Sequence, residues 1–517
     1  MANKNLFQSF IGKLLPATNA LNHEGAPAFA LEPKHQLAQY AATGCFGRTF
    51  YSTAGDQLDK VLALATELDV KYVGQCAIWA RRRGLMKDMP ALLCAVLSTR
   101  DLETLERVFP LVIDNGKMLR NFVQIVRSGV TGRKSLGSAP KRMVREWLAA
   151  RSVEAIFRDS VGQSPSMADV VKMVHPKPAD PARTALYGYL IGRAVDEAQL
   201  PEVVRAHERF KKGESREVPD VPMQMLVSLD LDDEAWKEIA RNASWTQMRM
   251  NLNTFARHGV FDDRALTNLL ATRLRNPEAI RRARAFPYQL LMAFLAADGD
   301  VPSNIREALQ DAMEIAIGNV PAIGSQVFVC PDVSGSMASA VTGGRKGSTS
   351  EVRCIDVAAL VAAAVLRKNP GAEVLPFEDK VVAIDLNPRD SVMTNAKKLA
   401  AIGGGGTSCS APLRELNRRR ATGDLVLFVS DNESWVDARK APSTAVMREW
   451  EVFRSRNPKA RLVCIDIQPH GTTQAVERDE ILNVGGFSDA VFDLVAEHAA
   501  SGSAPNRWVR EIEAIAI

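Results

Sequence analysis

Oxygen-bearing side chains stand at three places in the sequence where a buried strand should give way to a loop. One group follows the apolar run at 326–330, another follows the apolar run at 424–429, and a threonine follows four glycines at 403–406. Loops that leave the carboxyl ends of strands in an open α/β sheet converge on one crevice, so we expect these side chains to meet. They are Asp332, Ser334, Ser336, Thr407 and Asp431.

The chemistry of these five side chains favours a hard divalent cation. All five offer oxygen, none offers nitrogen or sulfur, and only two are carboxylates. Such a ligand set suits Mg²⁺, or the similar Mn²⁺, with some water molecules kept on the ion. A phosphate-binding or purely structural cluster of loops is the plainer alternative.

The spacing of the five side chains resembles the metal-ion-dependent adhesion site of von Willebrand factor A (vWA) domains, Asp-x-Ser-x-Ser with a distant Thr and Asp. The resemblance implies an open coordination position that accepts an acidic side chain of a partner. An Asp-x-Asp phosphatase is disfavoured because Ser334 stands where a second carboxylate would be needed, and Ser336 lies in no Gly-x-Ser-x-Gly elbow. Asp379 and Glu433 are near in sequence, but no general base or activated nucleophile is identifiable. We therefore interpret the site as ligand capture, and the protein as not an enzyme.

Composition is that of a globular protein of more than one domain. The chain has 517 residues, 46% hydrophobic and 24% charged, which is too long for one ordinary core. No apolar run reaches the length of a membrane span, and the first 19 residues do not resemble a signal peptide. Seven scattered cysteines without a Cys-x-x-Cys pair favour free thiols in a reducing compartment. We expect a cytoplasmic protein without membrane contact.

The net charge of +5 is unevenly distributed. Residues 1–320 hold 42 basic and 36 acidic side chains, whereas the remainder holds 23 and 24. Within 117–146, eight basic residues face a single acidic one, Glu146. A local excess of this kind is typical of a polyanion partner, because a merely solvated helix face usually intersperses acidic residues.

The hydrophobic pattern of the sequence changes near 318–324. Residues 31–320 carry helical periodicity without strand signals, which predicts stacked helix pairs of a degenerate, HEAT-like solenoid. After 324, short apolar strands alternate with helices, which predicts a doubly wound α/β sheet. The predicted helices are 56–69, 71–83, 89–98, 102–112, 142–150, 265–275, 354–368, 391–402, 445–454 and 487–498. The predicted strands are 326–330, 373–377, 381–384, 425–429 and 462–467, and a loop at 342–350 should lie beside the metal site.

Several local strings, taken in order ahead of the adhesion-type domain, resemble the Ro autoantigen family and its bacterial-type members. The resemblance covers the chain from about residue 31 to its end. It predicts an N-terminal extension at 1–30, a helical TROVE domain at 31–320 and a vWA domain at 321–517. The strings are GCFGRTFY at 44–51, GRKSLG at 132–137, SPSMADVVKMVHPKP at 164–178, NLNT at 251–254, AFPYQLL at 285–291, GGTSCSAP at 405–412 and FVSDNES at 428–434.

The resemblance implies a monomeric ring of helical repeats, closed by the vWA domain, that binds RNA. In the family, the positively charged hole accepts 3′ ends of misfolded RNA, the outer face binds small structured Y RNAs, and bacterial relatives can work with a 3′ exoribonuclease in RNA quality control. His175 matches a family histidine associated with Y RNA, although a helix-end structural role is the alternative. One family basic position falls at Gly162 and is lost or moved. The candidate RNA contacts are Lys117, Arg120, Arg127, Arg133, Lys134, Lys141, Arg142, Arg158, His175 and Lys177.

Two other function classes stay open. A protein-interaction adaptor would use the solenoid for proteins and the metal to capture an acidic residue. A Mg²⁺-dependent nuclease or phosphatase would need clustered carboxylates, commonly for two metals, and the motif supplies only two separated aspartates. The basic run favours RNA binding over both.

Overall fold

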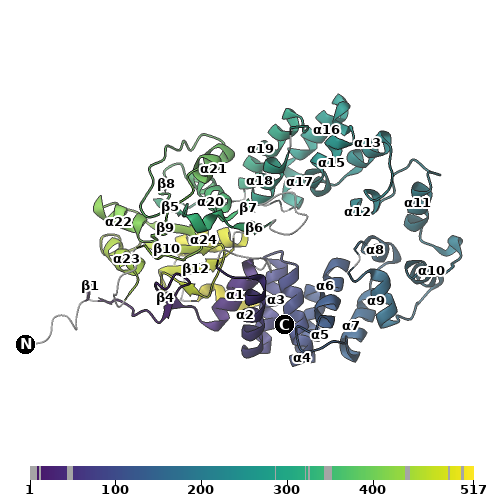
Figure 1. Cartoon of the computed structure of the whole chain (residues 1–517), viewed down its shortest axis with the longest axis horizontal. Helices are drawn as coiled ribbons and strands as arrows, with labels where there is room; N and C mark the ends of the chain where they lie inside the picture. The colour runs from purple at the N-terminus through teal and green to yellow at the C-terminus, as the bar shows by residue number, and fades with distance from the viewer. Residues whose placement is uncertain are drawn as a thin grey trace, which may run out of the picture. The chain divides into compact units, whose positions relative to one another are not determined.

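The computed structural model (Figure 1) describes most of the chain. The described residues are 9–10, 13–43, 51–162, 164–283, 285, 287–297, 299–318, 320, 322–323, 326–342, 352–436, 443–486, 489–501 and 506–517. Internal contacts group the chain into two compact units, called here the sheet unit (Met1–Leu64, Ile280–Ala296 and Leu309–Ala514) and the helical unit (Ala65–Ala279, Ala297–Ala308 and Ile515–Ile517). These groupings differ from the domain boundaries at 30/31 and 320/321, which stay a prediction.

The helical unit is built from short helices that pack on near neighbours in sequence. α3 packs on α4 and α5, α4 packs on α6, and α7 packs on α9, as expected for stacked helix pairs. The main helices are α3 (Val70–Arg82), α4 (Asp88–Arg100), α5 (Leu102–Val112), α6 (Gly116–Arg127), α7 (Ser138–Ala149), α8 (Val153–Arg158), α9 (Met167–Val174), α10 (Pro181–Leu190), α11 (Glu202–Lys211), α13 (Asp233–Asn242), α14 (Trp245–Met250), α15 (Leu252–Arg257) and α16 (Arg264–Leu274).

Several helix starts in this unit are fixed by side-chain caps. Asp101 accepts a hydrogen bond from the Thr104 amide at the start of α5, and Asn115 accepts one from Met118 at the start of α6. Ser166 forms a reciprocal capping box with Asp169 at α9. Each cap satisfies an amide that the helix itself leaves unbonded, and such a cap is typically worth about 1 kcal/mol.

The sheet unit contains a five-stranded sheet in the order β12-β10-β9-β5-β8, with every pair parallel. The strands are β5 (Val327–Pro331), β8 (Glu373–Val374), β9 (Leu425–Ser430), β10 (Arg461–Asp466) and β12 (Ile481–Gly485). The helices in this part of the chain are α20 (Cys354–Lys368), α21 (Val392–Ala400), α22 (Ala411–Arg418), α23 (Ala445–Arg456), α24 (Asp489–Ser501) and α25 (Arg507–Glu513).

Both faces of the sheet are buried. Alternate residues of β5, β9 and β10, such as Phe328, Phe428 and Cys464, form one core with α22 and α23, including Trp450. The intervening residues, such as Val329, point to the opposite face and are also buried, with α20 in contact with β5, β8 and β9. Helices on both faces of a parallel sheet define the doubly wound class, as predicted.

The N-terminal segment belongs to the sheet unit. β3 (Ala20–Leu21) pairs with β4 (Pro27–Ala30), and β4 pairs with β11 (Thr472–Thr473) in an antiparallel sheet. The Asn22 side chain donates to the Ser434 carbonyl at 2.8 Å, and the His23 amide donates to Glu433 at 2.8 Å. The segment therefore lies against the loop that follows β9.

Two predicted strands need correction, and two elements were missed. The predicted strand at 381–384 is wrong, because only an isolated bridge joins Phe377 and Val381 there. The strand at 373–377 is confined to β8, although Phe377 continues the pairing through one bridge to Asp332. β12 and α22 were not predicted, since a polar Asn483 interrupts the first and the second follows directly on the glycine loop. The predicted loop at 342–350 lies almost wholly outside the described residues.

Candidate functional site

The predicted oxygen cluster lies at the point where the strand order of the sheet reverses. The chain runs from β5 to β8 on one side and then returns to β9 on the other side of β5. Asp332, Ser334 and Ser336 follow β5, and Asp431 follows β9. Crevices at such switch points are where open α/β sheets hold ligands.

Backbone hydrogen bonds tie the glycine loop to the loop after β5. The Gly404 amide donates to the Val333 carbonyl at 3.1 Å, and the Gly335 amide donates to the Gly405 carbonyl at 3.2 Å. Gly405 has φ of 73°, and a Cβ built there would collide with the Glu378 side chain. Only glycine fits this position, which explains why a glycine run precedes Thr407.

Side-chain geometry fixes the first aspartate. The Ser430 hydroxyl donates to Asp332 Oδ2 at 2.6 Å, and the Ser334 amide donates to Asp332 Oδ1 at 2.9 Å. Ser334 Oγ and Ser336 Oγ lie 3.3 Å apart. These residues are buried, so their oxygen atoms are held in a preformed cluster.

Thr407 is positioned by the loop after β9. Its carbonyl accepts hydrogen bonds from the amides of Trp435 at 3.0 Å and Val436 at 3.1 Å. The Ser434 hydroxyl also donates to this carbonyl. Thr407 is 2% exposed and Asp431 is 1% exposed, so all five predicted oxygen residues are buried at the same edge of the sheet.

Excess negative charge marks the site as one that fits a cation. Burial, together with the neighbouring Asp431 carboxylate, raises the pKa of Asp332 to about 7. Burial also raises the pKa of Asp431, whose Oδ2 has no hydrogen-bond partner within the described structure. Asp466, buried beside them, likewise has a pKa well above its usual value. A buried acceptor without a donor, among carboxylates that repel one another, is what a bound divalent cation would resolve.

Sequence reasoning missed several neighbours of the cluster. Ser430 bonds Asp332, and Tyr51 makes a hydrogen bond with Ser336, although Tyr51 lies almost 300 residues away in sequence. Glu433, which was noted as a nearby carboxylate, faces His23. Asp379 is exposed near Gly406. Ser430 could have been found, because it ends the same strand as Asp431; Tyr51 carries no such signal.

The predicted RNA-contact residues all lie in the helical unit, with different exposure. Lys117 and Arg127 are exposed on α6, Lys134 is exposed in the loop before α7, and His175 and Lys177 are exposed after α9. His175 ends α9 with φ of 48°, a left-handed conformation. Among the described residues, no ion pair engages Lys117, Arg127 or Lys134 at 4.0 Å or less. Arg133 and Lys141 are half-buried.

Three of the predicted contacts already hold protein partners. Arg142 forms an exposed ion pair with Glu106, and Arg158 pairs with Asp220 at 2.6 Å. Arg120 is 9% exposed and donates to the Asp159 carbonyl. A Cβ on Gly162 would lie 2.8 Å from the Arg120 guanidinium, so this arginine occupies the space beside the missing family position. Their roles in RNA binding stay predictions.

A groove runs between the end of α6 and α9. Its volume is about 720 Å³, and Arg127 and Lys172 contribute the basic side chains. Ser128, Ser164 and Gln124 add polar groups, and the Asp169 carboxylate also lines the groove and interacts with both basic side chains. Lys172 was not among the predicted contacts, because it lies inside α9 rather than in the basic run.

None of the described helices combines the length and apolar character needed to span a bilayer. The described cysteines, among them Cys76, Cys330 and Cys464, are buried free thiols.

The fold and this edge-of-sheet oxygen cluster define a vWA-type domain that follows a helical region. A family model described as the Ro60 vWA domain matches residues 326–499. The RNA-binding protein RO60 of Deinococcus radiodurans is 24% identical over 96% of this chain and 99% of its own length. The protein of the same name from Caenorhabditis elegans is 25% identical over 58% of this chain and 48% of its own length.

A solved structure shows the same fold. The crystal structure of the Deinococcus radiodurans Ro (RSR) protein matches with a TM-score of 0.63 at 20% identity, over 90% of this chain and 99% of that chain. The predicted resemblance to the Ro family, and the predicted order of a helical region before an α/β domain, are thus confirmed.

Proposed function

We propose that the protein is a non-catalytic RNA-binding Ro protein that binds small structured non-coding RNA and the 3′ ends of misfolded RNA in RNA quality control. The observation that carries the proposal is the set of exposed cations Lys117, Arg127 and Lys134, none of which forms an ion pair within 4.0 Å with a described acidic side chain, although Arg127 lies near Asp169. The relatives named RNA-binding protein RO60 support the same ligand class.

Phosphate contacts by these side chains would set affinity and register without reading sequence. The groove between α6 and α9, with Arg127 and Lys172, supports contact with a structured backbone. Only 6% of the chain is aromatic, so recognition relies on charge, shape and 2′-hydroxyl contacts more than on base stacking. The 3′ end that reaches the protein could then be passed to a 3′ exoribonuclease partner.

A charge-removal experiment tests this function. The triple variant Lys117→Ala, Arg127→Ala, Lys134→Ala should weaken binding to a small structured RNA in a gel-shift salt series. Each lost phosphate contact should flatten the slope of log affinity against log salt by roughly 0.7–0.9. Unchanged affinity and slope would contradict the proposal.

A matched control removes three cations from the same unit. Arg205 and Arg209 on α11 pair with Glu202, and Lys211 pairs with Glu208. The variant Arg205→Ala, Arg209→Ala, Lys211→Ala changes the net charge equally but removes cations that acidic side chains already neutralise. It should leave RNA binding close to that of the wild type.

For the oxygen cluster we propose a Mg²⁺ site, with Mn²⁺ as an alternative, held by Asp332, Ser334, Ser336, Thr407 and Asp431. The unpartnered Asp431 Oδ2 and the raised pKa of Asp332 support it. When bound, the ion supplies an open coordination position for an anionic ligand. The serine and threonine hydroxyls would orient the bound ion.

This site favours a second candidate function, a metal-dependent adaptor that captures an acidic side chain of a protein partner. The two functions differ in what the metal site does to RNA affinity. RNA binding should be indifferent to loss of the metal, whereas capture of an acidic partner should require it.

A further inference from the structure

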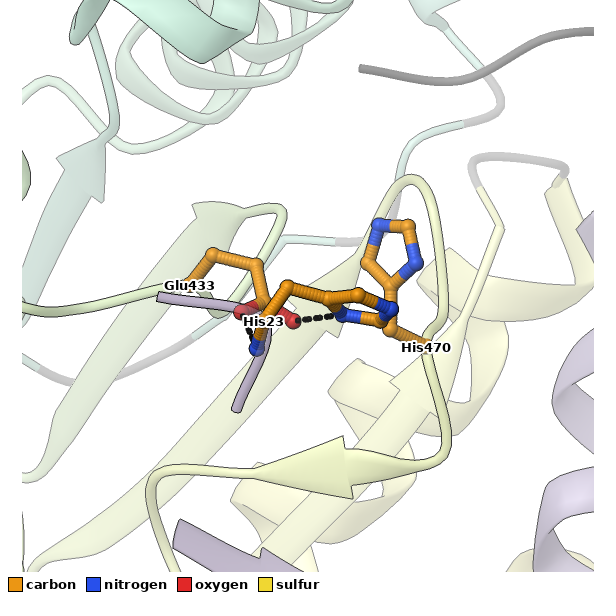
Figure 2. Close-up of side chains that lie close together, drawn as sticks. All are labelled: His23, Glu433 and His470. Carbon is orange, nitrogen blue, oxygen red and sulfur yellow. Dashed lines mark hydrogen bonds and ion pairs between the residues drawn. The ribbon is translucent and has the colours of Figure 1, made fainter. Parts of the chain in front are cut away.

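A second cluster of metal-ligand type lies beside the oxygen cluster and is chemically different from it. His23, Glu433 and His470 each offer one ligand atom, and these atoms lie within 4.8 Å of one another. Figure 2 shows the three side chains close together, with dashed lines between His23 and Glu433. His23 belongs to the N-terminal segment, Glu433 to the loop after β9 and His470 to the loop after β10. His23 is 410 residues from Glu433 in sequence.

The spacing within the cluster approaches that of a tetrahedral zinc site. His23 Nδ1 and Glu433 Oε1 lie 3.3 Å apart. Ligands about 2.0–2.1 Å from a tetrahedral Zn²⁺ are separated by roughly 3.3 Å. One pair of ligand atoms already has this separation, and the His470 nitrogen lies within 4.8 Å of both.

The ring of His470 points to an absent ligand independently of that spacing. His470 is 4% exposed, and its Nε2 is buried without a hydrogen-bond partner in the described part of the chain. A buried imidazole nitrogen normally finds a donor, an acceptor or a metal.

The surroundings hold the three ligands in place. The His23 amide donates to Glu433 Oε2 at 2.8 Å, which leaves Oε1 facing the imidazole. Lys60 donates to the His470 carbonyl at 2.9 Å, and the neighbouring Gly471 carbonyl accepts from Leu31 at 3.1 Å. Orientation of ligands by outer contacts is characteristic of built metal sites.

Some charged groups around the cluster favour a bound cation and others oppose it. The Lys60 ammonium lies close to both histidines, which opposes a cation. Glu433 is 1% exposed. Asp431 and Glu24 add further negative charge near Glu433. A divalent cation would compensate these carboxylates, and the half-exposed His23 ring leaves a route for its entry.

We propose that His23, Glu433 and His470 form a site for a borderline transition metal, Zn²⁺ or a chemically similar ion. Two imidazoles and one carboxylate are the ligand types that zinc prefers, whereas Mg²⁺ avoids nitrogen. Three protein ligands leave one position for water. The ion would clamp the N-terminal segment onto the ends of β9 and β10, and the inference depends on neither RNA binding nor the Mg²⁺ site.

Cobalt substitution of the full-length protein tests the proposal. After chelator treatment, Co²⁺ should give the visible absorption of a tetrahedral nitrogen- and oxygen-ligated ion, this signal should correspond to one Co²⁺ per chain, and Zn²⁺ should abolish it. His23→Ala should weaken this binding by about tenfold or more. Because the His23 side chain is 39% exposed, this variant should still fold. His470→Gln provides a second, independent loss of one ligand.

Two controls separate this site from other metal sites. His175→Ala removes an exposed histidine of the helical unit and should leave the Co²⁺ spectrum unchanged. Asp332→Ala alters the oxygen cluster and should also leave it unchanged. The proposal is overturned if the wild type shows no stoichiometric tetrahedral Co²⁺ signal. It is equally overturned if the signal survives in a folded His23→Ala, His470→Gln double variant.

Discussion

Asp424 and Asp431 stand at opposite ends of the same strand, β9, which makes them a matched pair for testing the oxygen cluster. Asp424 is exposed and accepts from the Gln326 amide at 3.2 Å, whereas Asp431 is buried with a free Oδ2. Asp431→Asn should weaken Mn²⁺ binding about tenfold or more, because it removes one of two carboxylates. Asp424→Asn should not. Electron paramagnetic resonance of Mn²⁺ measures both, and equal affinities would count against the site.

Glu477 should give the protein a pH-dependent stability that one substitution removes. Burial raises its pKa to about 7, while Asn483 donates to Oε2 from its amide at 3.0 Å and from its side chain at 2.8 Å. The raised pKa means that the folded state holds the proton more tightly. The stabilisation that protonated Glu477 gives the folded state is therefore fully present below about pH 4.5 and is lost as pH rises through about 7.

Denaturation of wild type and Glu477→Gln across this range measures the effect. The amide keeps an acceptor oxygen but cannot ionise. Wild type should lose roughly 1–2 kcal/mol relative to the variant between pH 4.5 and 7, a discounted value because the side chain is only partly buried. If the difference in unfolding free energy between wild type and Glu477→Gln does not change with pH, the pKa of Glu477 is not raised in the folded state.

At the scale of elements, Gly405 is the residue on which the glycine loop depends. Gly405→Ala would place a Cβ against Glu378 in a backbone with φ of 73°. We expect a loss of about 1–3 kcal/mol in stability and weaker Mn²⁺ binding, since Thr407 lies two residues on. Gly371→Ala is the control, because nothing lies within 4 Å of its added Cβ. Thermal unfolding and Mn²⁺ titration that fail to separate the two variants would refute this role.

Helix α7 permits a sharper test of the basic run. Lys141 and Arg142 are neighbours, but Arg142 already pairs with Glu106. An ion-paired guanidinium has less to gain from a phosphate, so Lys141→Ala should reduce RNA affinity more than Arg142→Ala. Gel shifts at low salt, where surface charge acts most strongly, give the comparison. A larger loss of RNA affinity in Arg142→Ala than in Lys141→Ala would indicate that Arg142 contacts the RNA.

Hydrophobic periodicity predicted the bounds of some helices and strands to within one residue. The helix predicted at 354–368 has those bounds in α20, and β9 ends one residue beyond its prediction. Prediction failed at 381–384, where an apolar run joins its neighbour through only one bridge. It also missed β12, whose Asn483 is buried and satisfied by Ala475 and Glu477, so polarity there does not mean exposure.

At the scale of the whole molecule, the two proposed activities occupy different compact units. The oxygen cluster lies in the sheet unit, and the exposed cations lie in the helical unit. Asp431→Asn should therefore leave the affinity for RNA within about twofold of wild type, while Mn²⁺ binding is weakened. Loss of RNA affinity in folded Asp431→Asn would indicate that the two units are functionally coupled, and it would favour the adaptor function.

The sequence predicted the five oxygen residues because each follows a recognisable strand or glycine run. It could not predict Tyr51 beside Ser336, nor the cluster of His23, Glu433 and His470. Those residues meet only because the N-terminal segment pairs with β11 and lies against the loop after β9. Long-range association of short segments leaves no period and no motif for sequence reasoning to detect.

RNA binding with a defined 3′ end tests the central claim most directly. A hairpin with a single-stranded 3′ tail is compared with the same hairpin, blunt-ended, by gel shift across a salt series. The account predicts tight, salt-sensitive binding that is stronger for the tailed hairpin. Equal, weak binding to both would contradict it and shift the function toward a metal-dependent adaptor.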